Sequence, residues 1–103
     1  MALNEKHMWL IAYDITDPRR LVRIHRYAKT VAIPVQYSLY ACYETARGIL
    51  GIRDALADMI NDREDDVRIY QLPQRLRVAR FGSRSLPKGL LVAEGVMPLA
   101  NTL

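Results

Sequence analysis

The chain has 103 residues, of which 50% are hydrophobic and 25% charged, an ordinary composition for one soluble globular domain. Its single cysteine, Cys42, excludes an internal disulfide and a cysteine-cluster zinc site, and no apolar stretch approaches the roughly 20 residues of a membrane span. With no secretory hydrophobic region at the start, these features predict a cytoplasmic protein without a membrane partner.

The net charge of +4 is unevenly distributed along the chain. Five bases lie between Arg19 and Lys29, and five more follow Pro73, whereas the stretch from Glu44 to Asp66 holds seven acids against three bases. A basic side of this kind favours an acidic partner. Because a domain this small gains stability from extra apolar burial, we also expect a homodimer.

The first predicted strand covers about Met8 to Ile15. Its run from Met8 to Tyr13 is apolar on both faces, as in a central strand that is covered on both sides. Thr16 or Asp17 then supplies a helix N-cap, with Pro18 at the first helical position. The helix that follows has a core-facing apolar stripe. Its opposite face carries Arg19, Arg23 and Arg26, and Arg20 lies in the first turn.

Residues 35–43 are rich in strand formers but lack a strong turn signal, so they form either one bent strand or two short strands. A second helix is predicted from after Thr45 to about Ile60. An acidic turn, residues 61–66, is expected to be solvated, because charge runs usually lie at the surface. Strands at 67–72 and about 76–81 follow.

Splitting the middle segment gives an α+β fold of the ferredoxin-like βαββαβ type, an antiparallel sheet with two helices on one face plus an extra C-terminal strand. We assign residues 1–82 to this domain, including that strand. Residues 83–103 form a tail that we expect to pack on the dimer partner.

Asp14 is the first candidate for chemistry, because a charge at the end of a buried strand requires a reason. It either accepts hydrogen bonds from backbone N–H groups or binds Mg²⁺ or Mn²⁺, hard cations that prefer oxygen ligands. One aspartate per chain gives a metal ion few protein ligands, but a twofold dimer would bring two copies of Asp14 together around one ion. Asp17 is better explained as a helix cap.

Arginines suit phosphate because their donors are planar and bidentate, so Arg19, Arg20, Arg23 and Arg26 are candidate contacts to nucleic-acid backbone. Solubility alone is the competing explanation for such a face. Ser38 is a candidate donor to phosphate, and a strand tyrosine such as Tyr40 either packs in the core or stacks on a base. His7 and His25 are expected to be structural or exposed.

Three motifs appear in order over residues 8–82: Leu10-Ile-Ala-Tyr-Asp-Ile-Thr-Asp17 before an arginine-rich helix, Pro34-Val-Gln-Tyr-Ser-Leu-Tyr40, and Asp66-Val-Arg-Ile-Tyr-Gln-Leu72. Together they resemble the small CRISPR-associated endoribonuclease family, the second universal CRISPR-associated protein. The chain departs from the family pattern at Ala32, Pro34 and Tyr40, where glycine, a basic residue and phenylalanine are usual.

The resemblance implies a ferredoxin-like homodimer whose last strand crosses to the partner's sheet, and a divalent metal held by Asp14 for cleavage of RNA or DNA. It also implies a role as bridge between copies of the CRISPR integrase during spacer acquisition. The leading hypothesis is therefore a metal-dependent endonuclease of CRISPR adaptation, and the alternative is a non-enzymatic DNA-binding scaffold. A small-molecule sensor on the same fold is a third hypothesis, but the sequence contains no glycine-rich ligand loop that would support it.

Overall fold

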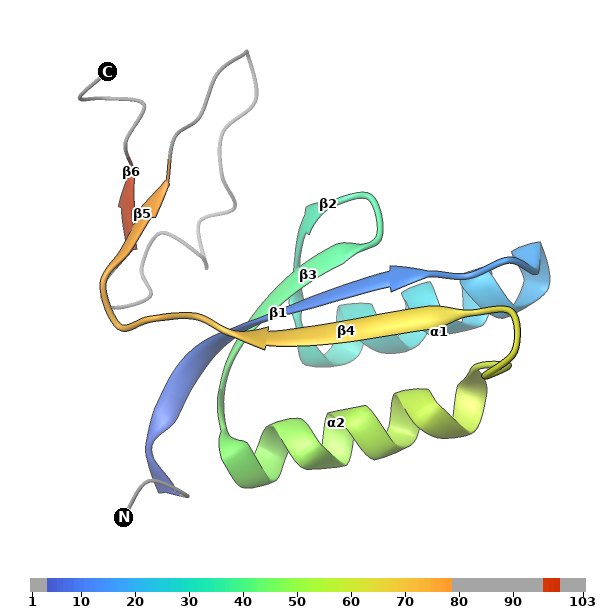
Figure 1. Ribbon diagram of the computed structural model, residues 1–103, viewed down its shortest axis with the longest axis horizontal. Coiled ribbons are helices and arrows are strands. Elements are labelled where there is room, and N and C mark those ends of the chain that lie inside the picture. The colour runs from blue at the N-terminus through green and yellow to red at the C-terminus, as the bar shows by residue number, and fades with distance from the viewer. Residues whose placement is uncertain (1–3, 79–95, 99–103) are drawn as a thin grey trace.

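The order of strands and helices in the computed structural model is the one expected for a ferredoxin-like α+β domain (Figure 1). The structure describes residues 4–78 and 96–98. Its elements are β1 (Lys6–Asp14), α1 (Pro18–Val31), β2 (Ile33–Gln36), β3 (Leu39–Thr45), α2 (Ala46–Met59), β4 (Asp66–Gln71), β5 (Leu76–Val78) and β6 (Val96–Pro98).

Four strands form the main sheet in the order β2-β3-β1-β4, with antiparallel pairing throughout. The first strand, β1, is central, as its two apolar faces predicted. The middle segment is two strands and not one bent strand, because a turn at Tyr37 and Ser38 separates β2 from β3. Ser38 has a φ of 61°, a left-handed conformation that is uncommon outside glycine and gives little signal in the sequence.

Side chains of β1 alternate between two different environments. Ile11 and Tyr13 point into the main core, where they join Ile24 of α1 and Leu56 of α2, so both helices cover the same face of the sheet. Figure 1 shows the two helices on that side. Met8 belongs to a second, smaller apolar cluster on the other face, with Leu10, Val35, Ala41 and Leu72.

Both helices begin at side-chain caps, and the sequence predicted the cap of α1 as Thr16 or Asp17. Asp17 caps α1 by accepting a hydrogen bond from the backbone N–H of Arg20 at 2.9 Å, and Pro18 follows at the first helical position. The hydroxyl of Thr45 caps α2 by accepting from the N–H of Gly48 at 3.0 Å. Each cap satisfies an N–H group that the first turn would otherwise leave without a partner.

Trp9, the single tryptophan of the chain, ties β1 to the end of β3. Its indole N–H donates to the backbone carbonyl of Glu44 at 2.9 Å, while its ring packs against the main core. The bond reinforces the β1–β3 pairing close to the start of α2.

The extra C-terminal strand is present as β5, which does not join the main sheet. It pairs in parallel with β6 as a separate two-stranded sheet. The expected continuation of this strand to Phe81, and most of the tail from residue 83, lie outside the described residues. Within the part that is described, no helix is long and apolar enough to cross a membrane.

Candidate metal and nucleic-acid site

Asp14 ends β1 with its side chain exposed to solvent. By the alternation of the strand, its carboxylate belongs to the same face as Met8 and Leu10, opposite the helices. Its backbone is well anchored, because the N–H of Tyr13 donates to the carbonyl of Ser38 at 3.1 Å and Ile15 is buried in the main core. A fixed backbone therefore presents an open carboxylate.

Asp66 lies directly across from Asp14 in the β1–β4 ladder. Side chains of such opposed residues stand about 5 Å apart at their Cβ atoms, on the same face of the sheet. Arg68 Nε donates to the Asp66 carboxylate at 2.9 Å, and both of these side chains are largely exposed. Asp66 is thus partly neutralised, whereas no ion pair reaches Asp14 within residues 4–78.

The described residues contain no group of three or more histidine, cysteine or acidic side chains that would enclose a metal ion. One chain offers Asp14, with Asp66 beside it. This donor set fits Mg²⁺ or Mn²⁺ better than zinc, because Mg²⁺ is commonly held by one or two carboxylates and keeps several waters.

Three of the four predicted phosphate contacts are exposed on α1. Arg19, Arg23 and Arg26 are free of ion pairs to other described residues. They lie on the solvent side of α1, and α1 packs on the sheet face away from Asp14. The structure therefore places these arginines and the candidate metal ligand on different layers, with Arg19 in the helical turn nearest to Asp14.

Arg20 is held differently, since only 17% of its side chain is exposed. Its guanidinium binds Asp65, with Nε donating to Oδ2 at 2.6 Å and Nη2 donating to Oδ1 at 3.1 Å, and Nη2 also donates to Glu64 at 3.1 Å. The structure thus brings Arg20 to a carboxylate pair in the α2–β4 turn. Its predicted phosphate contact remains a prediction.

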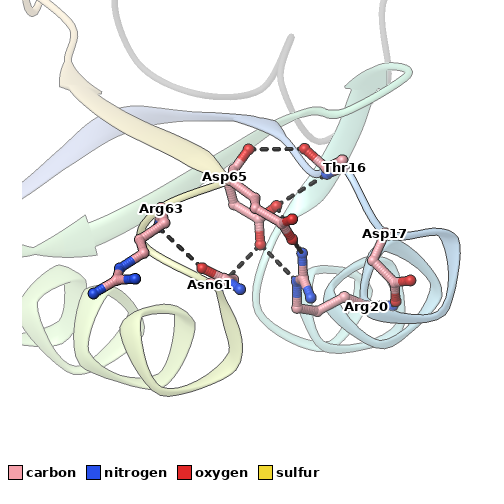
Figure 2. Close-up of polar contacts among 7 residues, drawn as sticks. Thr16, Asp17, Arg20, Asn61, Arg63 and Asp65 are labelled. Atoms are coloured by element: carbon pink, nitrogen blue, oxygen red, sulfur yellow. Dashed lines mark hydrogen bonds and ion pairs between the residues drawn. The ribbon is translucent and has the colours of Figure 1, made fainter.

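Asp65 is the centre of a polar network that joins two turns (Figure 2). Its side chain is fully buried, and it accepts hydrogen bonds from Arg20 and from the backbone N–H groups of Thr16 and Asn61, each of the latter at 2.9 Å. The hydrogen bonds from Arg20, aided by those from Asn61 and Thr16, outweigh burial and hold the pKa of Asp65 well below its usual range. The expectation of a wholly solvated acidic turn is wrong for this residue.

The other two predicted nucleic-acid contacts lie beside a cluster of aromatic side chains. Tyr40 is only 1% exposed and stacks on Tyr13 with ring centroids 6.0 Å apart, so in this structure its ring packs within the core and offers no surface to a base. Ser38 is half-buried in the β2–β3 turn, where its carbonyl accepts from Tyr13. A role for its hydroxyl at phosphate stays a prediction.

His25 is structural, as expected, and its partner is Tyr13. The two side chains share a hydrogen bond of 2.5 Å between the phenol oxygen and Nδ1. Burial raises the pKa of Tyr13 far above its usual value, so the phenol stays protonated beside the imidazole. The Tyr37 ring is tilted against His25, with the two ring centroids 5.5 Å apart, and Tyr37 is itself 76% exposed.

Sequence reasoning missed the role of Asp65 because two of its partners, Arg20 and Thr16, lie 45 and 49 positions earlier in the chain. The acidic run around it gave no sign that one member is buried. The Tyr13–His25 contact could not be predicted either, because helical periodicity places His25 at the edge of the apolar face but does not identify its contact partner.

Comparison with known proteins finds one family over most of the chain. The sequence model of the family "CRISPR associated protein Cas2" matches residues 7–78. "CRISPR-associated endoribonuclease Cas2 1" of Nitrosomonas europaea is 43% identical over 83 residues, covering 80% of this chain and 78% of that protein. "CRISPR-associated endoribonuclease Cas2 2" of Thermodesulfovibrio yellowstonii is 36% identical over 85 residues, covering 82% and 93%.

Solved structures give the same result for the fold. The crystal structure of the hypothetical protein TT1823 from Thermus thermophilus superposes with a TM-score of 0.70 at 29% identity, covering 81% of this chain and 99% of that one. Streptococcus pyogenes Cas2, in a crystal structure at pH 6.5, superposes with a TM-score of 0.59 at 27% identity, covering 64% and 86%.

Proposed function

Because the chain belongs to the Cas2 family of CRISPR-associated proteins, we propose that it is a divalent-metal-dependent endonuclease of CRISPR adaptation. In this proposal a homodimer hydrolyses phosphodiester bonds of RNA or DNA. The names of its relatives as endoribonucleases support the nuclease activity. The observation that carries the proposal is the exposed carboxylate of Asp14 on an anchored backbone.

Asp14 would hold Mg²⁺ or Mn²⁺, with waters completing the coordination shell. When bound, such a cation would polarise the phosphodiester and lower the pKa of a bound water, so that no nucleophile from the protein is needed. The role of Asp14 is to fix the position of that charge relative to the sheet. Asp66 is the weaker ligand of the two, because Arg68 already engages it.

A homodimer is supported by the sheet face that carries Asp14. This face holds the small apolar cluster of Met8, Leu10, Val35, Ala41 and Leu72, and no described helix covers it. Tyr43 and Tyr70, each about half exposed, extend it. Pairing of two such faces would bury apolar surface and bring two copies of Asp14 toward the same axis.

Arg19, Arg23 and Arg26 would hold the nucleic-acid backbone. Guanidiniums on a helix face contact phosphates without reading bases, so binding would depend on salt and not on sequence. This fits a protein that must accept many different invading sequences.

The test is cleavage of single-stranded RNA and of duplex DNA, with and without Mg²⁺ or Mn²⁺. We expect cleavage that needs metal and that falls to background in Asp14→Asn. The matched control is Asp62→Asn, which removes an exposed carboxylate of the α2–β4 turn and should cleave as the wild type does. Cleavage that survives Asp14→Asn unchanged would refute the catalytic role of Asp14.

A second candidate function is a DNA-binding scaffold that bridges the CRISPR integrase and performs no chemistry. It is favoured by the small number of candidate metal ligands among the described residues and by the placement of Asp14 and the arginine face on different layers of the fold. It predicts that Asp14→Asn binds duplex DNA and supports spacer acquisition as the wild type does, while a variant without the three arginines fails at both.

A further inference from the structure

The turn between β1 and α1, which carries the chain away from Asp14, is fastened to the turn between α2 and β4. We propose that Asp65, together with Arg20, is a positioning residue that fixes this turn and thereby the place of the Asp14 carboxylate. This inference rests on the proposed function, since it assigns a supporting residue to the same site. We call Thr16, Arg20, Asn61 and Asp65 the Asp65 clamp (Figure 2).

Both carboxylate oxygens of Asp65 are fully used. Oδ1 accepts from the Thr16 N–H at 2.9 Å and from Arg20 Nη2 at 3.1 Å. Oδ2 accepts from Arg20 Nε at 2.6 Å and from the Asn61 N–H at 2.9 Å. Four donors thus converge on one buried anion from three separate elements of the chain, and charged partners make such bonds short and strong.

The clamp acts on Asp14 through a short length of backbone. Thr16 is two residues beyond Asp14, and its hydroxyl also donates to the carbonyl of Glu64 at 2.8 Å. Asp14 itself is paired with Asp66 in the β1–β4 ladder, and Ile15, which lies between Asp14 and Thr16 in the chain, is buried. Each residue from 14 to 16 is therefore fixed in place, and Asp65 fixes Thr16 by accepting its backbone N–H.

A carboxylate is the group that this position requires. An asparagine amide would replace one acceptor oxygen with a donor, and in either orientation that donor would face Arg20 and one backbone N–H, of Thr16 or of Asn61. Arg20, whose side chain is mostly buried, would at the same time lose its closer and buried counter-charge and keep only the half-exposed Glu64. Asp62, in the same turn, is exposed and makes no hydrogen bond or ion pair with other described residues, which makes it a suitable control.

The clamp also changes the role of Arg20. Its fork is occupied by Asp65 and Glu64, so we assign Arg20 to the support of the site and not to the phosphate-binding face. Arg20→Lys keeps the charge but loses the bidentate geometry, and it is expected to weaken the clamp without removing it.

The experiment compares full-length wild type, Asp65→Asn, Arg20→Lys and Asp62→Asn at a temperature well below all melting points. Amide hydrogen exchange of residues 14–17 reports the turn directly. Mn²⁺ affinity, measured by electron paramagnetic resonance, and kcat with KM for RNA cleavage report the site. If Asp65→Asn does not fold, as judged by circular dichroism, Arg20→Lys carries the same test.

We expect faster exchange at Thr16, Mn²⁺ affinity lower by about tenfold and lower kcat with unchanged KM in Asp65→Asn, as for other residues that support metal ligands. Arg20→Lys should show smaller effects, and Asp62→Asn none. Unchanged exchange at Thr16, or faster exchange with unchanged Mn²⁺ affinity and kcat, would overturn the inference. If the wild type neither binds Mn²⁺ nor cleaves, the proposed function fails, and exchange at Thr16 alone decides whether the clamp holds the turn.

Discussion

The salt dependence of nucleic-acid binding separates the three exposed arginines of α1 from the engaged Arg20. Each guanidinium that neutralises one phosphate of duplex DNA steepens the plot of log affinity against log salt by about 0.9. Three such contacts in one protomer give a slope of about −2.7, or a loss of about 40-fold in affinity between about 50 and about 200 mM salt. Arg23→Gln should reduce the slope to about −1.8 and the loss to about 12-fold.

The assay is fluorescence anisotropy of a labelled duplex in the presence of EDTA, so that no cleavage occurs during the titration. Arg20→Gln should leave the slope unchanged, because Asp65 and Glu64 already occupy its donors. Arg53→Gln is the control for loss of an exposed arginine elsewhere, since Arg53 lies on α2 and pairs with Asp54 at 3.0 Å. The reasoning is refuted if removing Arg19, Arg23 and Arg26 together leaves the slope of the wild type, or if Arg20→Gln lowers it as much as Arg23→Gln does.

Three further outcomes follow from the same structure. If the proposed homodimer forms through the apolar face of the sheet, Leu10→Lys should give a folded monomer in sedimentation velocity, because it places a charge in that face. Val22→Lys, at an exposed position of α1, should leave the oligomeric state of the wild type unchanged. A dimeric Leu10→Lys would contradict this interface. The folded-state pKa of Asp65 is lowered, so its contribution to stability is present above the unfolded value of about 3.9 and is lost as pH falls below it. The difference in melting temperature between wild type and Asp65→Asn should accordingly be largest near pH 7 and shrink below about pH 4, and a difference that is constant across that range would contradict this account. Burial, with a smaller effect from Glu44, raises the pKa of Cys42 to about 11; the thiol should react with Ellman's reagent only after unfolding, and rapid labelling of native protein would show that the core opens.

Much of the fold was predictable from the sequence because its signals are local. Asp17 and Pro18 are adjacent, so the start of α1 could be read from two neighbouring residues. The division between β2 and β3 could not, because the turn relies on Ser38 in a left-handed conformation and contains no glycine. Asp14 could be predicted as a candidate because a charged residue directly after an apolar run is visible in the sequence alone.

The surroundings of the candidate site required the structure. Asp65 and Arg20 are 45 residues apart, and no pattern within the acidic run distinguishes the buried Asp65 from the exposed Asp62 or Glu64. Tyr40 shows the opposite case, in which a residue whose motif suggested contact with nucleic acid is packed in the core. Alternation along β1 predicts which residues share a face, but the position of α1 relative to Asp14 depends on how the helix packs.

Trp9, whose indole N–H donates to the Glu44 carbonyl, makes the intrinsic fluorescence of this protein a probe of the β1–β3 pairing. As the chain has one tryptophan, all indole emission comes from a single place on the central strand. Loss of the β1–β3 pairing will expose that ring to water and shift its emission to longer wavelength. Refolding kinetics of the central hairpin can therefore be followed by fluorescence without attaching a dye.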